Sequence, residues 1–260
     1  MVSISDKEHK IYQSVVGKLL YLLKHSRPEL SNCVREVSKA MKMAGEKHVK
    51  EVIRILTFIL HNPNQALFVK PESTLKNPTI EEIKEFECEI DGMSDSTWTN
   101  KTEEGHSIAG WIIRIMGALA GWGCRQIKHI TLSTAESEYA AALEMVKELQ
   151  FVKNMMEWMG LKVKLPMKIY LDNQAAIMMI RNNYTTVGSR HCSLRVWYLR
   201  DLYMKRIIDP IYVKSEENIS DILTKNATRE LFEKHSLKMV ENVQPEYLTQ
   251  KLEEAELEHG

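Results

Sequence analysis

Four acidic residues stand where side chains from separate elements could meet: Asp95 in SDSTW, Glu138 in STAESEY, Asp172 in YLDNQ and Asp221 in NISDILTK. Two divalent cations about 4 Å apart can activate a water molecule and stabilise the leaving oxygen of an in-line phosphoryl displacement. Such cations take oxygen ligands, and carboxylates offset their charge. Four carboxylates in the order Asp–Glu–Asp–Asp therefore indicate a catalytic site for two metal ions.

The elements that would position these residues form an α/β pattern from Phe86 onward. Alternating apolar residues predict strands in FECEIDGMSD, SIAGWIIRIM and ALAGWGCRQI, the last two separated by Gly117. A long helix from about Ala135 to Met159, a strand at 165–172, two helices, a strand in IDPIYVKS and closing helices from ENISDILTKN follow. This order places Asp95 and Asp172 at strand ends and the other two acids near helix starts.

Two of the four positions have a rival. Asp91 lies four residues before Asp95 on the same strand face. In the long helix, Ser133 and Glu136 have the spacing of a capping box, whereas Glu138 begins the apolar stripe that must pack on the sheet. That stripe continues through Ala142, Val146, Leu149, Val152, Met156 and Met159, and Trp158 is also expected in the core. We therefore favour Glu138, because a buried acid is costly unless it has a partner such as a metal.

Residues 1–64 are predicted to form a helical segment with three helices, the first broken at Pro28. Residues 65–85 connect it to the α/β domain at 86–241, and residues 242–260 form a charged tail. The chain has 35 basic and 35 acidic residues, so no basic excess points to nucleic acid. Four cysteines without a CxxC pair fit reduced thiols. The polar N-terminus and short apolar runs predict no signal peptide and no membrane span, hence an intracellular protein, cytoplasmic or nuclear.

Several polar residues near the carboxylates are candidates for contacts with nucleic acid. Arg125 and Lys128, between the third strand and the long helix, could hold backbone phosphates. Asn173 and Gln174 could bond to the minor groove and to RNA 2′-hydroxyls, although Asn173 serves equally well as a helix cap. His191 could contact a phosphate, or stand at a helix start with no such role.

These motifs together resemble a known family. The runs SDSTW, STAESEY, YLDNQAAI, SRHCSLR and EENISDILTKN are similar to the ribonuclease H domain of copia-type LTR retrotransposon polyproteins, over about residues 91–240. The N-terminal YQSVVGKLLYLLKHSRPEL and EVIRILTFIL resemble the thumb and connection region that follows the polymerase palm.

The resemblance implies a ribonuclease H-like fold: a mixed five-stranded sheet with helices on both faces, here with an N-terminal helical extension. It also implies Mg²⁺-dependent cleavage of the RNA strand of an RNA–DNA hybrid, leaving 3′-hydroxyl and 5′-phosphate ends, with Mn²⁺ as a possible substitute for the two Mg²⁺ ions. Asp95, Glu138, Asp172 and Asp221 match the catalytic carboxylates of the family. The polymerase part of the same polyprotein is an expected partner.

The chain departs from the family where His-x-Asp-x-Arg-Tyr-His becomes HCSLRVW. His191 and Arg195, expected to bind nucleic acid, are retained, whereas Ser193 and Trp197 replace the Asp and the second His. No Tyr-x-Asp-Asp motif is present, so DNA polymerisation by this chain alone is not expected. A start at a point internal to such a polyprotein suggests a fragment, a degenerate copy or a domesticated gene. The alternative hypothesis is therefore a non-catalytic remnant that binds hybrid or protein; an integrase, which needs a later Glu, fits less well.

Overall fold

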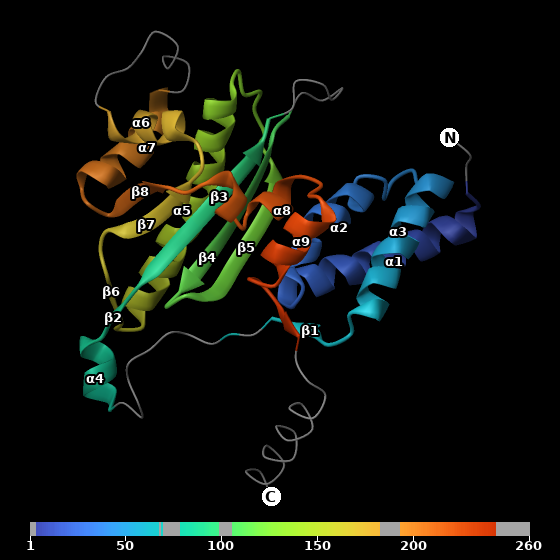
Figure 1. Ribbon diagram of the computed structural model, residues 1–260, viewed down its shortest axis with the longest axis horizontal. Coiled ribbons are helices and arrows are strands. Elements are labelled where there is room, and N and C mark those ends of the chain that lie inside the picture. Colours follow the sequence, from blue (N-terminus) through green and yellow to red (C-terminus); the bar gives the residue numbers. More distant parts are fainter. Residues whose placement is uncertain (1–3, 68, 70–78, 99–105, 183–192, 243–260) are drawn as a thin grey trace, which may run out of the picture. The chain divides into compact units, whose positions relative to one another are not determined.

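The chain divides into two compact units in the computed structural model, which describes residues 4–67, 69, 79–98, 106–182 and 193–242 (Figure 1). One unit comprises Met1–Phe68 with Phe232–Gly260, and the other comprises Val69–Leu231. Residues 232–241, which the sequence analysis assigned to the α/β domain, thus group with the N-terminal helices. The exact domain boundaries stay a prediction.

The first unit is built from helices. α1 (Asp6–His25), the short helix η1 (Pro28–Leu30), α2 (Ser31–Ser38) and α3 (Glu46–His61) surround a common core that includes Tyr12, Val16, Leu30, Val34 and Val52. β1 (Gln65–Ala66) pairs antiparallel with β9 (Glu241–Asn242), and α9 (Arg229–Ser236) spans the boundary between the units. The first helix ends before Pro28, as predicted, and η1 begins at this proline.

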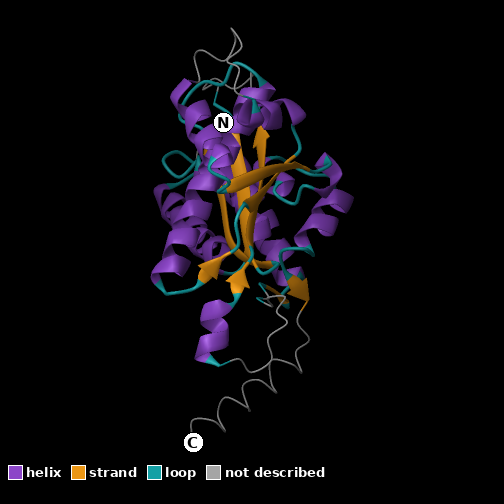
Figure 2. Cartoon of the chain, turned by 90° about the vertical axis from the view of Figure 1, so that its left-hand side faces the viewer, coloured by secondary structure: helices purple, strands orange, loops and turns teal. Residues whose placement is uncertain are grey.

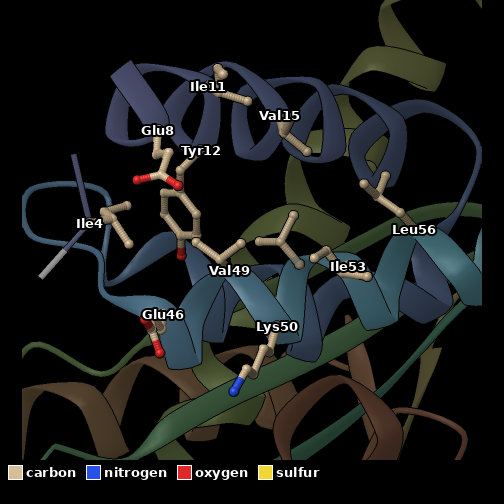
Figure 3. A pocket seen from close by; sticks show the side chains of 11 residues that line it. Ile4, Glu8, Ile11, Tyr12, Val15, Glu46, Val49, Lys50, Ile53 and Leu56 are labelled. Atoms are coloured by element: carbon tan, nitrogen blue, oxygen red, sulfur yellow. The ribbon is translucent and has the colours of Figure 1, made fainter. Parts of the chain in front are cut away.

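An apolar cavity of about 470 Å³ lies between α1 and α3 (Figure 3). Ile11 and Val15 of α1 face Val49 and Ile53 of α3 across it. Ile11 and Ile53 are more than half exposed, so one side of this helical unit presents apolar surface to solvent.

The second unit contains a five-stranded sheet in the order β5-β4-β3-β7-β8. Its strands are β3 (Ile90–Thr97), β4 (Ile108–Ile115), β5 (Ala118–Gln126), β7 (Met167–Leu171) and β8 (Ile208–Tyr212). β3, β4 and β5 are antiparallel neighbours, whereas β7 and β8 run parallel to β3. Met116 and Gly117, both with positive φ, form the two-residue turn between β4 and β5, as Gly117 predicted. β2 (Glu87–Cys88) pairs with β6 (Lys162–Val163), and α4 (Ile80–Glu85) precedes them.

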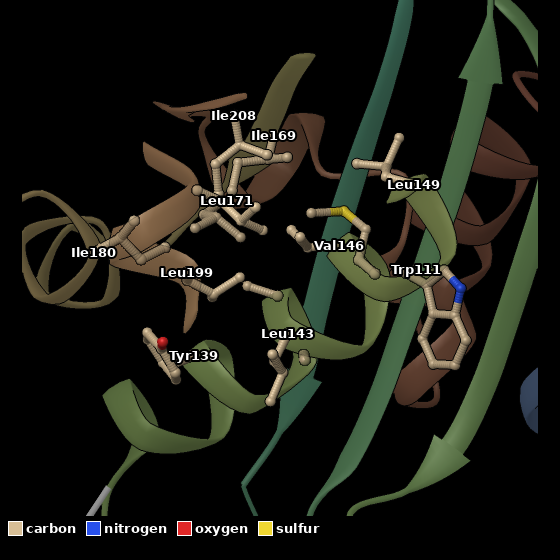
Figure 4. Packing of buried hydrophobic residues seen from close by; sticks show 14 of the residues in the cluster. Trp111, Tyr139, Leu143, Val146, Leu149, Ile169, Leu171, Ile180, Leu199 and Ile208 are labelled. Atoms are coloured by element: carbon tan, nitrogen blue, oxygen red, sulfur yellow. The ribbon is translucent and has the colours of Figure 1, made fainter. Parts of the chain in front are cut away.

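Helices cover both faces of this sheet. On one face, α5 (Thr134–Trp158) packs on β3 and β4 beside α6 (Gln174–Arg181) and α7 (Ser193–Met204). Side chains of α5 such as Val146 and Leu149 meet Ile169 and Leu171 of β7 in one core (Figure 4). On the other face, α8 (Asp221–Thr224), preceded by the short helix η3 (Ser215–Glu217), packs on β3 and β4. Figure 2 displays the strands among their helices. The predicted ribonuclease H-like fold is confirmed by this topology.

Some predicted details were wrong. Asp95 is not the last residue of its strand, because β3 continues to Thr97. Trp158 is 88% exposed and Met159 is 55% exposed, although Met156 is buried as expected. Trp158 lies two residues, or about 200° of helical turn, beyond Met156, so it faces away from the sheet. Among the described helices, none is both long and apolar enough to cross a bilayer.

Candidate metal centre

Three of the four predicted carboxylates converge on one point. Asp95, Glu138 and Asp172 each offer an oxygen atom, and these atoms lie within 4.8 Å of one another. Asp95 comes from β3, Glu138 from the second turn of α5, and Asp172 follows β7, the parallel neighbour of β3. We call these three residues the carboxylate cluster. Sequence reasoning therefore found its members, although they come from separate parts of the chain.

Asp95 is fixed from the side of the sheet that α8 covers. It pairs with Gly110 of β4, and its Oδ2 accepts a hydrogen bond from the hydroxyl of Thr224. Its other oxygen, Oδ1, is buried without a hydrogen-bond partner. The side chain is thus held in place while one oxygen remains available to a ligand.

Glu138 is fixed by the backbone of β3. Its Oε1 accepts a hydrogen bond from the Ser96 backbone N–H at 3.3 Å, and the hydroxyls of Ser96 and Ser137 lie 2.7 Å apart. Its Oε2 is buried without a hydrogen-bond partner. Asp172 is half-buried, and the Ser215 hydroxyl donates to its Oδ2 at 2.8 Å.

Burial makes ionisation of this cluster difficult. Burial raises the pKa of Asp95 to about 7, although Lys225 and the hydrogen bond from Thr224 oppose the shift. Burial also raises the pKa of Glu138 to about 9, with further contributions from the charges of Asp95 and Asp172. Carboxylates that repel one another in a buried place need a positive charge to become ionised together.

The residues present fit a divalent cation. A buried carboxylate oxygen that accepts no hydrogen bond is costly, and two such oxygens, Asp95 Oδ1 and Glu138 Oε2, belong to the cluster. An all-oxygen donor set of carboxylates is the kind that Mg²⁺ and Mn²⁺ prefer. Asp95, Glu138 and Asp172 would be the residues that hold the ion.

Asp221, the fourth predicted ligand, does not join the cluster directly. It is buried at the start of α8, and its Oδ1 lies 2.5 Å from the ammonium nitrogen of Lys225. The same nitrogen lies 3.6 Å from Oδ1 of Asp95. Lys225 therefore bridges Asp221 to the cluster.

The two rivals have structural roles instead. Arg114 donates to Oδ1 of Asp91 from Nε at 2.8 Å and from Nη2 at 2.6 Å, on the neighbouring strand. Glu136 accepts from the backbone N–H of Leu132 at 2.7 Å, while Ser133 caps α5 by accepting from the Glu136 N–H. Both interactions lie at the N-terminal end of α5, one turn before Glu138.

The residues predicted to bind nucleic acid have varied surroundings. Arg125 lies within β5 rather than after it; it pairs with Glu144 and Glu148 of α5, and its guanidinium lies 4.7 Å from the centre of the Trp111 ring. Lys128 and Gln174 are exposed. Asn173 caps α6 by accepting from the Ala176 N–H at 3.0 Å.

Two of these residues lie beyond what the structure describes in full. His191 falls outside the described residues, and Arg195 lies in α7 at a position where only the backbone is described. Trp197, which replaces the second family His, is 55% exposed. A role in binding nucleic acid stays a prediction for all of these residues.

Gly110 allows α8 to lie against the sheet beside Asp95. A Cβ at this position would lie 2.6 Å from Cγ2 of Thr224 and 2.9 Å from Cβ of Leu223. Any larger residue must therefore push α8 away, together with the Thr224 hydroxyl that holds Asp95 and the nearby Asp221. Nothing in the sequence around Gly110 indicates this contact, because it joins positions more than 100 residues apart.

We expect Gly110→Ala to lower hybrid cleavage by roughly 10- to 100-fold, because a displacement of about 1 Å at a catalytic group has an effect of that size. The overpacking should also cost roughly 1–3 kcal/mol of unfolding free energy. Gly121→Ala on β5 is the matched control, since its Cβ would approach no atom closer than 3.7 Å. Equal cleavage rates and melting temperatures for the two variants would contradict the role given to Gly110.

Lys225, Thr224 and Ser215 were missed by the sequence analysis. Lys225 could have been found, because it lies four residues after Asp221, the spacing at which a Lys meets an Asp on a helix. Thr224 and Ser215 could not, since small hydroxyl residues are common and their contacts depend on tertiary packing.

Comparison with known proteins supports the resemblance inferred from the motifs. The retrovirus-related Pol polyprotein from transposon RE1 of Arabidopsis thaliana is 25% identical over 228 residues, or 88% of this chain. The corresponding polyprotein from transposon TNT 1-94 of Nicotiana tabacum is 27% identical over 223 residues, or 85% of this chain. The similarity to retrotransposon Pol polyproteins thus extends through both units. The chain spans only 15% and 16% of the length of these relatives.

No family model matches the chain. Among solved structures, LC11-RNase H1 in complex with RNA/DNA hybrid is similar with a TM-score of 0.41 and 13% identity, covering 52% of this chain and 94% of that one. The fold assignment made above rests on the order and direction of the strands.

Proposed function

We propose that this chain is a metal-dependent endoribonuclease that cuts the RNA strand of an RNA–DNA hybrid within the reverse-transcription machinery of a retroelement. The observation that carries this proposal is the carboxylate cluster, with two buried oxygens that lack hydrogen-bond partners on a ribonuclease H-like sheet. The similarity to Pol polyproteins supports the retroelement context. The polymerase part of such a polyprotein is the proposed protein partner.

Each residue of the cluster has a distinct task in the proposed reaction. Divalent cations, when bound, supply Lewis-acid activation of water and stabilise the charge that develops on the scissile phosphate. Asp95 and Glu138 supply the buried oxygens, and their fixed hydrogen bonds to Thr224 and Ser96 keep those oxygens oriented. Asp172 is only half-buried and is held by a hydrogen bond from Ser215.

Binding of the hybrid is proposed to use exposed residues beside the cluster. Gln174 directly follows the cap residue of α6, two positions after Asp172, and could reach the minor groove. Lys128 precedes α5 in the loop after β5 and could contact a phosphate. His191 and Arg195 stay candidates on the basis of the resemblance alone.

The test is cleavage of an RNA–DNA hybrid with either strand labelled, incubated with the full chain and Mg²⁺ or Mn²⁺. We expect cutting of the RNA strand alone and complete loss of cutting when a chelator removes the metal. Single-stranded RNA and duplex DNA of the same sequence serve as matched controls and should stay intact.

Two results would count against the proposal. Cutting that persists in excess chelator would exclude the metal-dependent reaction. Folded protein that binds the hybrid but leaves it intact with both metals would favour the non-catalytic remnant, to which the replacements at Ser193 and Trp197 already point.

A further inference from the structure

Lys225 belongs to the candidate site, but neither the motifs nor the proposed reaction assigns a task to it. Its ammonium nitrogen lies 2.5 Å from Oδ1 of Asp221 and 3.6 Å from Oδ1 of Asp95. The side chain is 42% exposed, whereas the two carboxylates are almost fully buried. A half-exposed cation thus reaches into a buried acidic site and contacts a carboxylate on each side.

This position is the one that a second cation would need. The carboxylate cluster gathers three ligands without Asp221, so a first divalent cation can bind there while Lys225 keeps its ion pair with Asp221. A second cation that used Asp221 would have to share Oδ1 of Asp95 with the cluster, and Lys225 already lies between these two carboxylates. Lys225 and a second divalent cation therefore compete for the same oxygens.

The charges lead to the same conclusion. One divalent cation and one ammonium group leave four ionised carboxylates with a single uncompensated negative charge, whereas adding a second divalent cation would make the site positive. Like charges a few ångströms apart repel strongly where water is largely excluded. A second cation is therefore favoured only when Lys225 turns outward to solvent or when an anionic group enters the site.

We propose that the ammonium group of Lys225 occupies the second cation position between Asp95 and Asp221, so that without nucleic acid the chain binds one divalent cation tightly. This inference rests on the proposed function for the identity of the site, but it concerns metal occupancy and not cleavage. The scissile phosphate of a hybrid would bring the negative charge that allows a second cation to bind. Lys225 would thereby couple full metal loading to the presence of substrate.

The experiment is a Mn²⁺ titration of the metal-free full chain in the absence of nucleic acid. Calorimetry measures the affinities, and electron paramagnetic resonance counts the bound Mn²⁺ ions. We expect one tightly bound ion in the wild type. Lys225→Met and Lys225→Gln, two neutral replacements of similar length, should bind the second ion at least about tenfold more tightly, which corresponds to about 1.4 kcal/mol. Lys225→Arg keeps the charge and should behave as the wild type.

Lys205→Met is the matched control. Lys205 forms an i,i+4 pair with Asp201 at 2.7 Å, the same spacing as Lys225 with Asp221, but at an exposed helix end. We expect its Mn²⁺ binding to equal that of the wild type. A second Mn²⁺ that binds to the two neutral Lys225 variants no more tightly than to the wild type would overturn the inference, and so would an equal gain in Lys205→Met.

The results that reject the proposed function differ from those that reject the role of Lys225. Suppose that the wild type binds one Mn²⁺, that Lys225→Met binds a second ion tightly, and that the wild type still leaves the hybrid uncut. These results would support the role of Lys225 and reject the nuclease. A hybrid cut normally by a wild type that already binds two ions with equal affinity would reject the role of Lys225 alone. Far-ultraviolet circular dichroism of each variant verifies that it is folded.

Discussion

Asp172→Asn should abolish hybrid cleavage, with a rate at least about 1,000-fold below that of the wild type, or about 4 kcal/mol in the activation barrier. The replacement removes one charged ligand of the carboxylate cluster and changes almost nothing else. Asp172 is half-buried, and an amide oxygen can still accept the hydrogen bond from Ser215. The variant should therefore fold normally and melt within a few degrees of the wild type. Asp95→Asn should lose cleavage to the same extent. It should also keep its fold, because the amide oxygen can still accept the hydrogen bond from Thr224.

Asp91→Asn is the matched control for these two variants. Asp91 lies on the same strand face as Asp95 but pairs with Arg114 and stands outside the carboxylate cluster. Its replacement should lower stability slightly and leave cleavage within a few-fold of the wild type. Single-turnover cleavage and thermal unfolding of the three variants provide the comparison. Full activity of Asp172→Asn, or inactivity of Asp91→Asn with an intact fold, would mean that the site has been assigned to the wrong residues.

Glu138→Gln should make the metal-free protein more stable at alkaline pH, even though it removes a proposed catalytic ligand. Burial raises the pKa of Glu138 from 4.5 to about 9 in the folded chain. Between these values the unfolded chain releases a proton that the folded chain retains, so the wild type loses stability as pH rises through this window. Glutamine carries no such penalty and can still accept the hydrogen bond from the Ser96 N–H.

The expected gain for Glu138→Gln is roughly 2–4 kcal/mol at pH 8 and close to zero at pH 5, as the pKa difference implies. Urea unfolding in the presence of chelator at the two pH values measures it. Saturating Mn²⁺ should reverse the order, because a ligand that binds the folded state stabilises the wild type most. Glu136→Gln, two residues earlier on α5, is the control for loss of a carboxylate from this helix outside the carboxylate cluster. The same pH dependence for the wild type and Glu138→Gln would contradict the proposed buried, protonated state.

Local signals in the sequence were sufficient to predict most strands of the sheet and to single out the three acidic residues of the carboxylate cluster. Period-two apolar residues indicated β3, β4 and β5, and Gly117 marked the turn between the last two. The choice of Glu138 over Glu136 followed from helical periodicity, and the structure agrees, because Glu138 is buried beside Asp95 and Glu136 serves at the cap. The predicted strands and the burial of Glu138 are confirmed, because each depends on residues close together in the chain, whereas the catalytic role of the carboxylates stays a prediction.

The features that the sequence did not predict depend on contacts between segments that are far apart in the chain. The approach of α8 to the sheet requires the missing Cβ of Gly110, and the pairing of Lys225 with both Asp221 and Asp95 depends on that approach. The exposure of Trp158 was missed for a different reason: its apolar type was given more weight than its angular position on α5. Periodicity, which was available in the sequence, would have placed Trp158 correctly.

The most direct test of the metal centre is anomalous X-ray scattering from crystals of the wild-type chain soaked in Mn²⁺. We predict an anomalous peak within coordination distance, about 2.0–2.3 Å, of carboxylate oxygens from Asp95, Glu138 and Asp172. The same soak of Asp172→Asn should give a weaker peak or none at this point. Well-occupied Mn²⁺ elsewhere in the wild-type crystal, with no peak among these three carboxylates, would contradict the metal centre and the nuclease built on it.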